Sequence, residues 1–220
     1  MRKTVLLTMM VGLVGSAAWA QNEGKVEVSA TAGWTFSDGV SGGTVTVAGD
    51  DFSRIDPKDS FSWNLRLGYM ITHNAEVGFL YGQQASTLQI SGPSRTADLG
   101  DETLHNYHGY FAYNFGESEK VQPYVLLGLG ATQFGSVNAS FGGNARSIGG
   151  NTKFSSTWAV GVKVFPSKNV GIRLEGRWTP TYIKTDAAGW WCDPYWGCYT
   201  LGNAQYANQF ELGGGLAFRF

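Results

Sequence analysis

The sequence predicts an all-β fold, an eight-stranded antiparallel transmembrane β-barrel of the up-and-down meander type. Three observations predict it. Eight segments alternate apolar with polar or small residues at a period of two, as strands with one apolar face do. The connections between these segments alternate strictly between short and long. After residue 20, no apolar run is long enough for a membrane-spanning helix.

The predicted strands recur along the whole chain, and the first one is typical. Every second residue from Val26 to Trp34 is apolar or alanine, whereas Glu27, Ser29 and Thr31 lie on the other face. In chain order the segments cover residues 26–34, 61–69, 75–82, 107–115, 124–131, 157–164, 170–178 and 210–220. The segment 124–131 alternates least regularly. Strands of about ten residues can cross a bilayer at a tilt.

The apolar faces of these strands carry large aromatic residues, among them Trp34, Phe61, Trp63, Trp158 and Trp178. A soluble eight-stranded barrel of the lipocalin type is the alternative fold, but its outward face would be polar. Aromatic residues on an outward face suit the girdles at the two lipid interfaces. Closure of the barrel also pairs every backbone group, which lipid demands. The pattern therefore favours a membrane barrel.

The lengths of the connections predict the topology. Short links cover residues 70–74, 116–120 and 166–169, and long ones cover 37–60, 86–103, 135–151 and 181–205. Transmembrane barrels have short periplasmic turns and longer extracellular loops. Both termini of the barrel should then face the periplasm. The long links are rich in Gly, Ser, Asn and Asp, and we expect mobile surface loops.

The N-terminal segment has the pattern of a secretory signal peptide. Arg2 and Lys3 precede a short apolar run, which ends in Ala-Trp-Ala at 18–20. We expect cleavage after residue 20, with a single barrel domain over 21–220; a retained N-terminal helix is the alternative. The whole chain has 16 basic and 17 acidic side chains, so it has no basic surplus that would suggest a nucleic-acid partner.

The C-terminal segment alternates apolar with polar or small residues up to its last residue. The apolar residues are Phe210, Leu212, Leu216, Phe218 and Phe220. A soluble domain rarely ends on such a strand, because its edge and its apolar face would be exposed. The pattern resembles the terminal strand that the barrel-assembly machinery recognises in outer-membrane proteins, with an aromatic residue at the end.

The segments YNFG (113–116), QPYVLLGLGA (122–131), NVGIRLEGRW (169–178) and GGGLAFRF (213–220) resemble the small outer-membrane β-barrel family of OmpA-like and opacity-type porin proteins. The resemblance covers essentially the whole chain after residue 20, but only the barrel part of the larger OmpA-like proteins. It implies location in the bacterial outer membrane, contact with outer-membrane lipid and lipopolysaccharide, and assembly by the barrel machinery. The family serves as adhesins, structural anchors and minor channels.

The polar faces of the strands carry charges that should point into the lumen. They are Glu27, Arg66, Glu76, Lys163, Arg173, Glu175, Arg177, Glu211 and Arg219. Eight strands leave an interior that side chains can just fill. A nearly neutral ion-pair network that plugs the barrel is one interpretation, and a narrow polar path for small solutes or ions is the other.

Catalytic chemistry has little support in the sequence. Acyl transfer, which lipid-modifying barrels perform, needs a nucleophile and a base within hydrogen-bond reach. His73 lies in a predicted turn, and His105 and His108 lie three apart on a strand and so point to opposite faces. We expect no enzymatic activity and no cofactor.

The link 181–205 contains both cysteines of the chain, Cys192 and Cys198. Two cysteines in a secreted chain predict one disulfide, and Asp193, Pro194 and Gly197 provide turn residues between them. A structural zinc site would need four ligands, and neither a C-x2-C pair nor a nearby histidine supplies the others.

The same link is rich in aromatic residues: Trp190, Trp191, Tyr195, Trp196 and Tyr199. Exposed aromatic patches mark contact sites, although these rings could instead pack on the barrel rim or on lipid. We therefore expect a monomeric barrel with a structural or adhesin-like surface-binding role, acting through its extracellular loops on an external ligand or host surface. A narrow channel is the alternative function.

Overall fold

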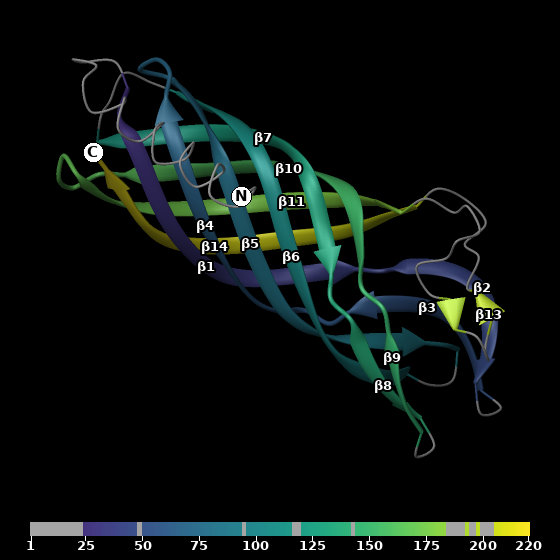
Figure 1. Ribbon diagram of the computed structural model, residues 1–220. Coiled ribbons are helices and arrows are strands. Elements are labelled where there is room, and N and C mark those ends of the chain that lie inside the picture. The colour runs from purple at the N-terminus through teal and green to yellow at the C-terminus, as the bar shows by residue number, and fades with distance from the viewer. Residues whose placement is uncertain are drawn as a thin grey trace, which may run out of the picture.

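Eight long antiparallel strands close into a barrel in the computed structural model, which describes residues 24–47, 50–93, 96–115, 120–141, 144–183, 192–193, 197–198 and 205–220. In ring order these barrel strands are β1 (Val26–Asp38), β4 (Ser60–Met70), β5 (Ala75–Ser91), β6 (Thr96–Asn114), β7 (Val121–Phe134), β10 (Asn151–Val164), β11 (Val170–Ile183) and β14 (Gln205–Arg219). Pairing of β1 with β14, from Glu27↔Arg219 to Asp38↔Asn208, closes the ring. The predicted fold class is confirmed (Figure 1). No helix long and apolar enough to cross a membrane occurs among the described residues.

The long connections contain further strands. These are β2 (Val40–Val47), β3 (Asp50–Pro57), β8 (Val137–Phe141), β9 (Asn144–Ile148), β12 (Cys192–Asp193) and β13 (Gly197–Cys198). The strands β2 and β3 form a hairpin, and β3 also pairs with the last residues of β5. They lie at the end of the barrel opposite the C-terminus, together with β8 and β9 (Figure 1). Longer connections mark the extracellular end of such barrels, so this end is extracellular.

The expectation that these long links are loops is wrong for the residues that the structure describes. The predicted link 86–103 is mostly strand, since β5 continues to Ser91 and β6 begins at Thr96. The reason is visible in the sequence, because the period of two continues through Leu88 and Ile90 with the polar residues between them. What changes is which face is apolar.

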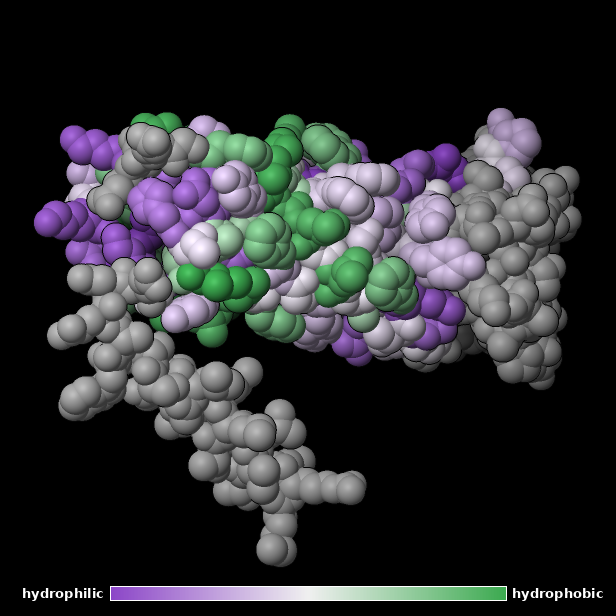
Figure 2. Space-filling view, turned by 90° about the horizontal axis from the view of Figure 1, so that it is seen from above, coloured by the Kyte–Doolittle hydropathy of each residue, from purple (hydrophilic) through white to green (hydrophobic). Residues whose placement is uncertain are grey.

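The side-chain pattern of the barrel reverses along its axis. In the part formed by residues 26–36, 60–82, 105–115, 120–132, 154–179 and 208–220, here called the membrane-spanning region, the outward side chains are mostly apolar and the buried ones mostly polar. Thus Phe79 and Phe111 are exposed, whereas Glu76 and His108 are buried. Figure 2 shows apolar side chains gathered along the barrel between hydrophilic groups toward its two ends.

The described residues of 37–59, 83–104, 133–153 and 180–207, here called the extracellular region, follow the opposite rule. The buried side chains there include Phe52, Leu88, Ile90, Leu104 and Val137. A bulge on β6 opposite Leu88 turns Leu99 toward the same apolar interior. The interior of this region is mostly apolar, as in a water-soluble barrel, and the region continues the membrane-spanning barrel on its extracellular side.

Candidate functional site: the barrel interior

The structure places all nine charged residues of the polar strand faces inside the barrel, where each is buried. Five are cations and four are carboxylates. Burial of charges is costly unless each finds a partner of opposite sign or several hydrogen bonds. The interior meets this requirement with three groups of contacts, stacked along the barrel axis.

The first group centres on Lys163 of β10. Its Nζ atom lies 2.9 Å from Glu27 Oε1 and 2.5 Å from Glu76 Oε2, so one ammonium joins carboxylates from β1 and β5. Glu27 also receives Arg219 Nη2 at 3.0 Å, while Arg173 Nη1 lies 3.8 Å away. This group joins five barrel strands, β1, β5, β10, β11 and β14, through side chains rather than through backbone hydrogen bonds.

The second group contains two tyrosines that the sequence analysis did not include in the site. Tyr110 donates to Glu76 at 2.6 Å, and Tyr124 donates to Glu175. Arg66 binds Glu175 with both terminal nitrogens, and Arg173 Nε donates to the Tyr124 hydroxyl at 3.0 Å. Both tyrosines lie on the inward strand faces, opposite the apolar outward residues, and that position was the available signal.

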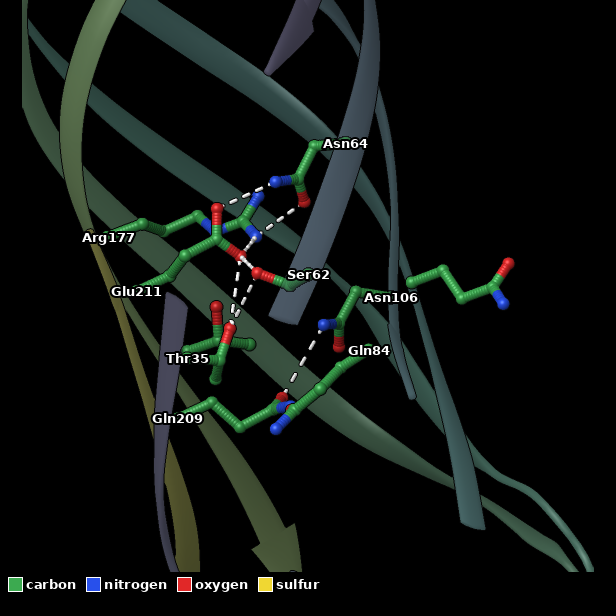
Figure 3. Close-up of a pocket in the computed structure, with 10 residues that line it drawn as sticks. Thr35, Ser62, Asn64, Gln84, Asn106, Arg177, Gln209 and Glu211 are labelled. Carbon is green, nitrogen blue, oxygen red and sulfur yellow. Dashed lines mark hydrogen bonds and ion pairs between the residues drawn. The ribbon is translucent and has the colours of Figure 1, made fainter. Parts of the chain in front are cut away.

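The third group is centred on Glu211 of β14 (Figure 3). Arg177 Nη2 donates to Glu211 Oε2 at 2.7 Å, and Ser62 donates to the same oxygen at 2.7 Å. Asn64 donates to Glu211 Oε1 at 2.7 Å and accepts from Arg177 at 2.5 Å. The carboxylate is therefore fully hydrogen-bonded, although Arg177 Nη1 has no partner.

A small cavity lies beside this third group. Besides Arg177, Glu211, Ser62 and Asn64, it is lined by polar side chains from five strands: Thr35, Gln83, Gln84, Asn106, Thr179 and Gln209. It offers about 10 Å³ for the centres of water molecules, which is the room for about one water. Amide contacts close it, since Gln209 donates to Gln84 at 2.6 Å. The cavity can therefore hold about one water but not a solute.

The histidines do not form a catalytic arrangement. His108 is buried, and its Nε2 lies 2.9 Å from Ser155 Oγ, which in turn lies 3.0 Å from Thr132 Oγ1. His105 points outward, where its Nδ1 lies 2.9 Å from the Tyr81 hydroxyl, and His73 lies in an exposed turn. No cluster of His, Cys, Asp and Glu suited to a metal ion occurs among the residues that the structure describes.

The predicted assembly signal and the cysteine link lie elsewhere. The side chains of Phe210, Leu212, Leu216, Phe218 and Phe220 on β14 are exposed on the outward face. The backbone pairs Cys192 directly with Cys198, as β12 and β13 run antiparallel. The aromatic residues predicted as contacts, Trp190, Trp191, Tyr195, Trp196 and Tyr199, lie outside the described residues.

Three described carboxyl groups of the extracellular region have shifted pKa values, and burial raises that of Asp56. Hydrogen bonds from Lys58 and Gln89 hold the pKa of Asp98 below its ordinary value. Burial raises the pKa of Glu102 to about 7. Glu102 is only 3% exposed, and its Oε2 atom has no hydrogen-bond partner. Sequence analysis did not identify Glu102, because its burial depends on the extracellular strands that it did not predict.

Taken together, apolar outward side chains, a polar filled interior and backbone closure define a transmembrane β-barrel of the bacterial outer membrane. The family model for the outer membrane protein beta-barrel domain matches residues 5–220. The chain belongs to this family, as the resemblance of its segments to small outer-membrane barrels predicted.

Solved structures show the same fold at low sequence identity. The outer membrane protein OprG from Pseudomonas aeruginosa is 13% identical with a TM-score of 0.65, over 90% of this chain and 96% of that one. The outer membrane protein AlkL, determined in DMPC lipid bilayers, is 15% identical with a TM-score of 0.55, over 91% and 92%. Neisserial surface protein A is 17% identical with a TM-score of 0.52, over 90% and 97%. Among curated protein sequences none matches this chain.

Proposed function

We propose that this protein is a non-enzymatic, monomeric outer-membrane barrel that acts through its extracellular region, in a structural or adhesin-like surface-binding role. The observation that carries the proposal is the contrast between the filled interior of the barrel and the strands that extend into the extracellular region. The interior is filled by ion pairs around Lys163, Glu175 and Glu211, and its cavity has room for about one water. The strands, by contrast, extend beyond the membrane-spanning region into the extracellular region.

Enzymatic activity has no support in this arrangement. Among the described histidines, His108 is the one in the interior that lies next to a hydroxyl group. It is completely buried beside Ser155. A substrate could not reach this pair without displacing the surrounding hydroxyl and amide contacts. The partners we propose are outer-membrane lipid and lipopolysaccharide around the barrel, the assembly machinery on the Phe210–Phe220 strand, and an external ligand or host surface.

The link between β11 and β14 is the first segment to test. A variant lacking residues 186–200 should assemble normally and show heat-modifiable gel migration, but should lose adhesion of cells to host or matrix components. A variant lacking residues 116–119, in the link between β6 and β7 that the sequence predicts to be periplasmic, is the control. Unchanged adhesion of the 186–200 deletion would refute a binding role for this link.

A narrow channel is the second candidate, because Arg177, whose Nη1 atom has no hydrogen-bond partner, lines a polar cavity within the lumen. Planar-bilayer recordings separate the two functions. A plugged barrel should give no steady conductance, and neither Arg177→Met nor Glu211→Gln should alter that baseline. Steady single-channel currents in the wild-type protein, changed by either substitution, would favour the channel instead.

A further inference from the structure

Glu102 is an exception to the polarity of the region in which it lies. Around it, the buried side chains of the extracellular region are mostly apolar. Glu102 pairs with Ser86 across β5, and Leu104 and Leu88 lie on the same inward face next to this pair. On the other side of β6, the chain passes from Phe134 to Val137, and both are buried. The inward neighbours of Glu102 in the sheet are thus the apolar Leu88 and Leu104 and the polar Ser86 and Gln84.

Nothing in these neighbouring strands compensates a negative charge on Glu102. Ser86 directs its hydroxyl to the Lys58 carbonyl oxygen, 2.6 Å away, and not to the carboxyl. Lys58 Nζ binds Asp98 Oδ2 at 2.8 Å on the exposed surface. Asp101 points outward, within 3.4 Å of Thr87 Oγ1.

Among the side chains that the structure describes, the remaining strands supply no counter-ion either. Between residues 83 and 91 of β5, and between 130 and 137 on the β7 side, the sequence has no charged residue. Lys153 of β10 aligns through Thr132 with Asn106, four residues away from Glu102 along β6. Four residues of strand span about 13 Å. With no counter-ion among the described side chains, an ionised Glu102 would be a buried, unpaired charge, which is the most costly kind of buried group.

We propose that Glu102 is a pH-sensitive lock on the extracellular region: the neutral acid packs with Leu88, Leu104 and Val137, and its ionisation releases the β5–β6 hairpin and β8 from one another. The lock acts on the surface that the proposed function assigns to binding, but it does not depend on any ligand. Raised local pH loosens the extracellular region, whereas the ion-paired membrane-spanning region stays closed. A change of external pH near neutrality thereby becomes a change in the shape of the exposed surface.

Hydrogen exchange followed by mass spectrometry tests the lock in the purified, lipid-reconstituted full-length protein. The amides of residues 84–104 and 134–141 are compared at pH 5.5 and 8.5, after correction for the intrinsic chemical rate. A carboxyl with a pKa of about 7 when closed and an ordinary pKa when open should lose about 30-fold in protection over this interval. The amides of β11 and β14 in the membrane-spanning region should not change.

Two variants make the test specific. Glu102→Gln should abolish the pH dependence, because the amide fills the same space and does not ionise. Asp101→Asn, on the same strand with an outward carboxyl, should keep the wild-type response. If Glu102→Gln does not assemble, Glu102→Leu is the second uncharged variant. The lock is refuted by a wild-type protein without the pH response, or by an uncharged variant that retains it.

Discussion

The two regions of this barrel solve the same folding problem in opposite solvents. In the membrane-spanning region, lipid accepts apolar side chains such as Leu127 and Leu129, and the interior must therefore satisfy the polar ones. In the extracellular region, water accepts Thr87 and Gln89, and the interior is held by Leu88 and Ile90. The backbone ladder between β5 and β6 runs through both regions with a single bulge. One continuous sheet thus changes its inner and outer faces where the solvent changes.

This difference also decides what each region tolerates. The membrane-spanning interior depends on partners of opposite charge, so removing one partner leaves another charge buried and unpaired. The extracellular interior is stabilised by apolar area buried from water, so an unpaired charge buried there destabilises the fold. Four predictions test the comparison, from the largest expected effect to the smallest.

Removal of the central cation should cost the most. Lys163→Met leaves Glu27 and Glu76 buried without the ammonium that joins them. We expect a loss of about 3–5 kcal/mol in the free energy of unfolding, measured by urea titration in detergent micelles. Lys58→Met is the matched control, because its ion pair with Asp98 is exposed, and it should leave stability unchanged within error. Equal effects of the two lysines would contradict the role of the network.

A new charge on the outward face should be costly in one region only. Leu127→Arg places a guanidinium in the hydrocarbon near the middle of β7 and should cost about 2–4 kcal/mol in a lipid-bilayer unfolding assay. Thr87→Arg, on the outward face of the extracellular region, should be close to neutral. A similar cost at both positions would show that the boundary between the regions is misplaced.

Stability should depend on pH through Glu102. Its pKa is raised by burial to about 7 in the folded protein, above the ordinary value of 4.5. A carboxyl whose pKa is raised on folding does not destabilise the folded state at a pH below its ordinary pKa of 4.5. The folded state then loses stability as the pH rises from 4.5 through 7. Glu102→Gln should therefore stabilise by up to about 3 kcal/mol at pH 8 and by close to nothing at pH 4.5. Chemical denaturation at the two pH values measures this, and a stabilisation independent of pH would contradict it.

The pairing of the cysteines should have the smallest effect. Opposed residues of two antiparallel strands lie close enough for a disulfide, and Cys192 and Cys198 occupy such positions. The proposed bond closes a short loop and should stabilise the extracellular region by about 2 kcal/mol. Alkylation with and without reductant, followed by intact mass, should show two cysteines that react only after reduction. Free thiols in the unreduced protein would exclude the bond.

Much of the fold could be predicted from the sequence because alternation follows directly from strand geometry. Residues such as Glu76 and Phe79 fall on opposite faces whatever the neighbouring strand is. The extracellular parts of β5 and β6 could not be predicted from an apolar face turned to lipid, because there the apolar face turns inward. Leu88 and Ile90 do alternate with Thr87 and Gln89 in the sequence, but here the apolar residues point inward instead of toward lipid.

The interior was predictable in kind but not in pairing. The polar strand faces indicated that Lys163 and Arg173 point inward, and both do. Which carboxylate each cation meets depends on residues more than a hundred positions apart, as in the contact of Arg66 with Glu175. Tyr110 and Tyr124 were missed for the same reason, since their hydroxyls matter only through the carboxylates beside them.

The sequence by itself determined the barrel class, the number of membrane-spanning strands and the set of charges that enter the lumen. These follow from a period of two, which each strand carries alone. Only the tertiary structure decided where the outer and inner faces exchange polarity, which charges pair, and that Glu102 is buried without a partner. These properties belong to contacts between strands, and their register follows from barrel closure and the surrounding solvent rather than from any one segment.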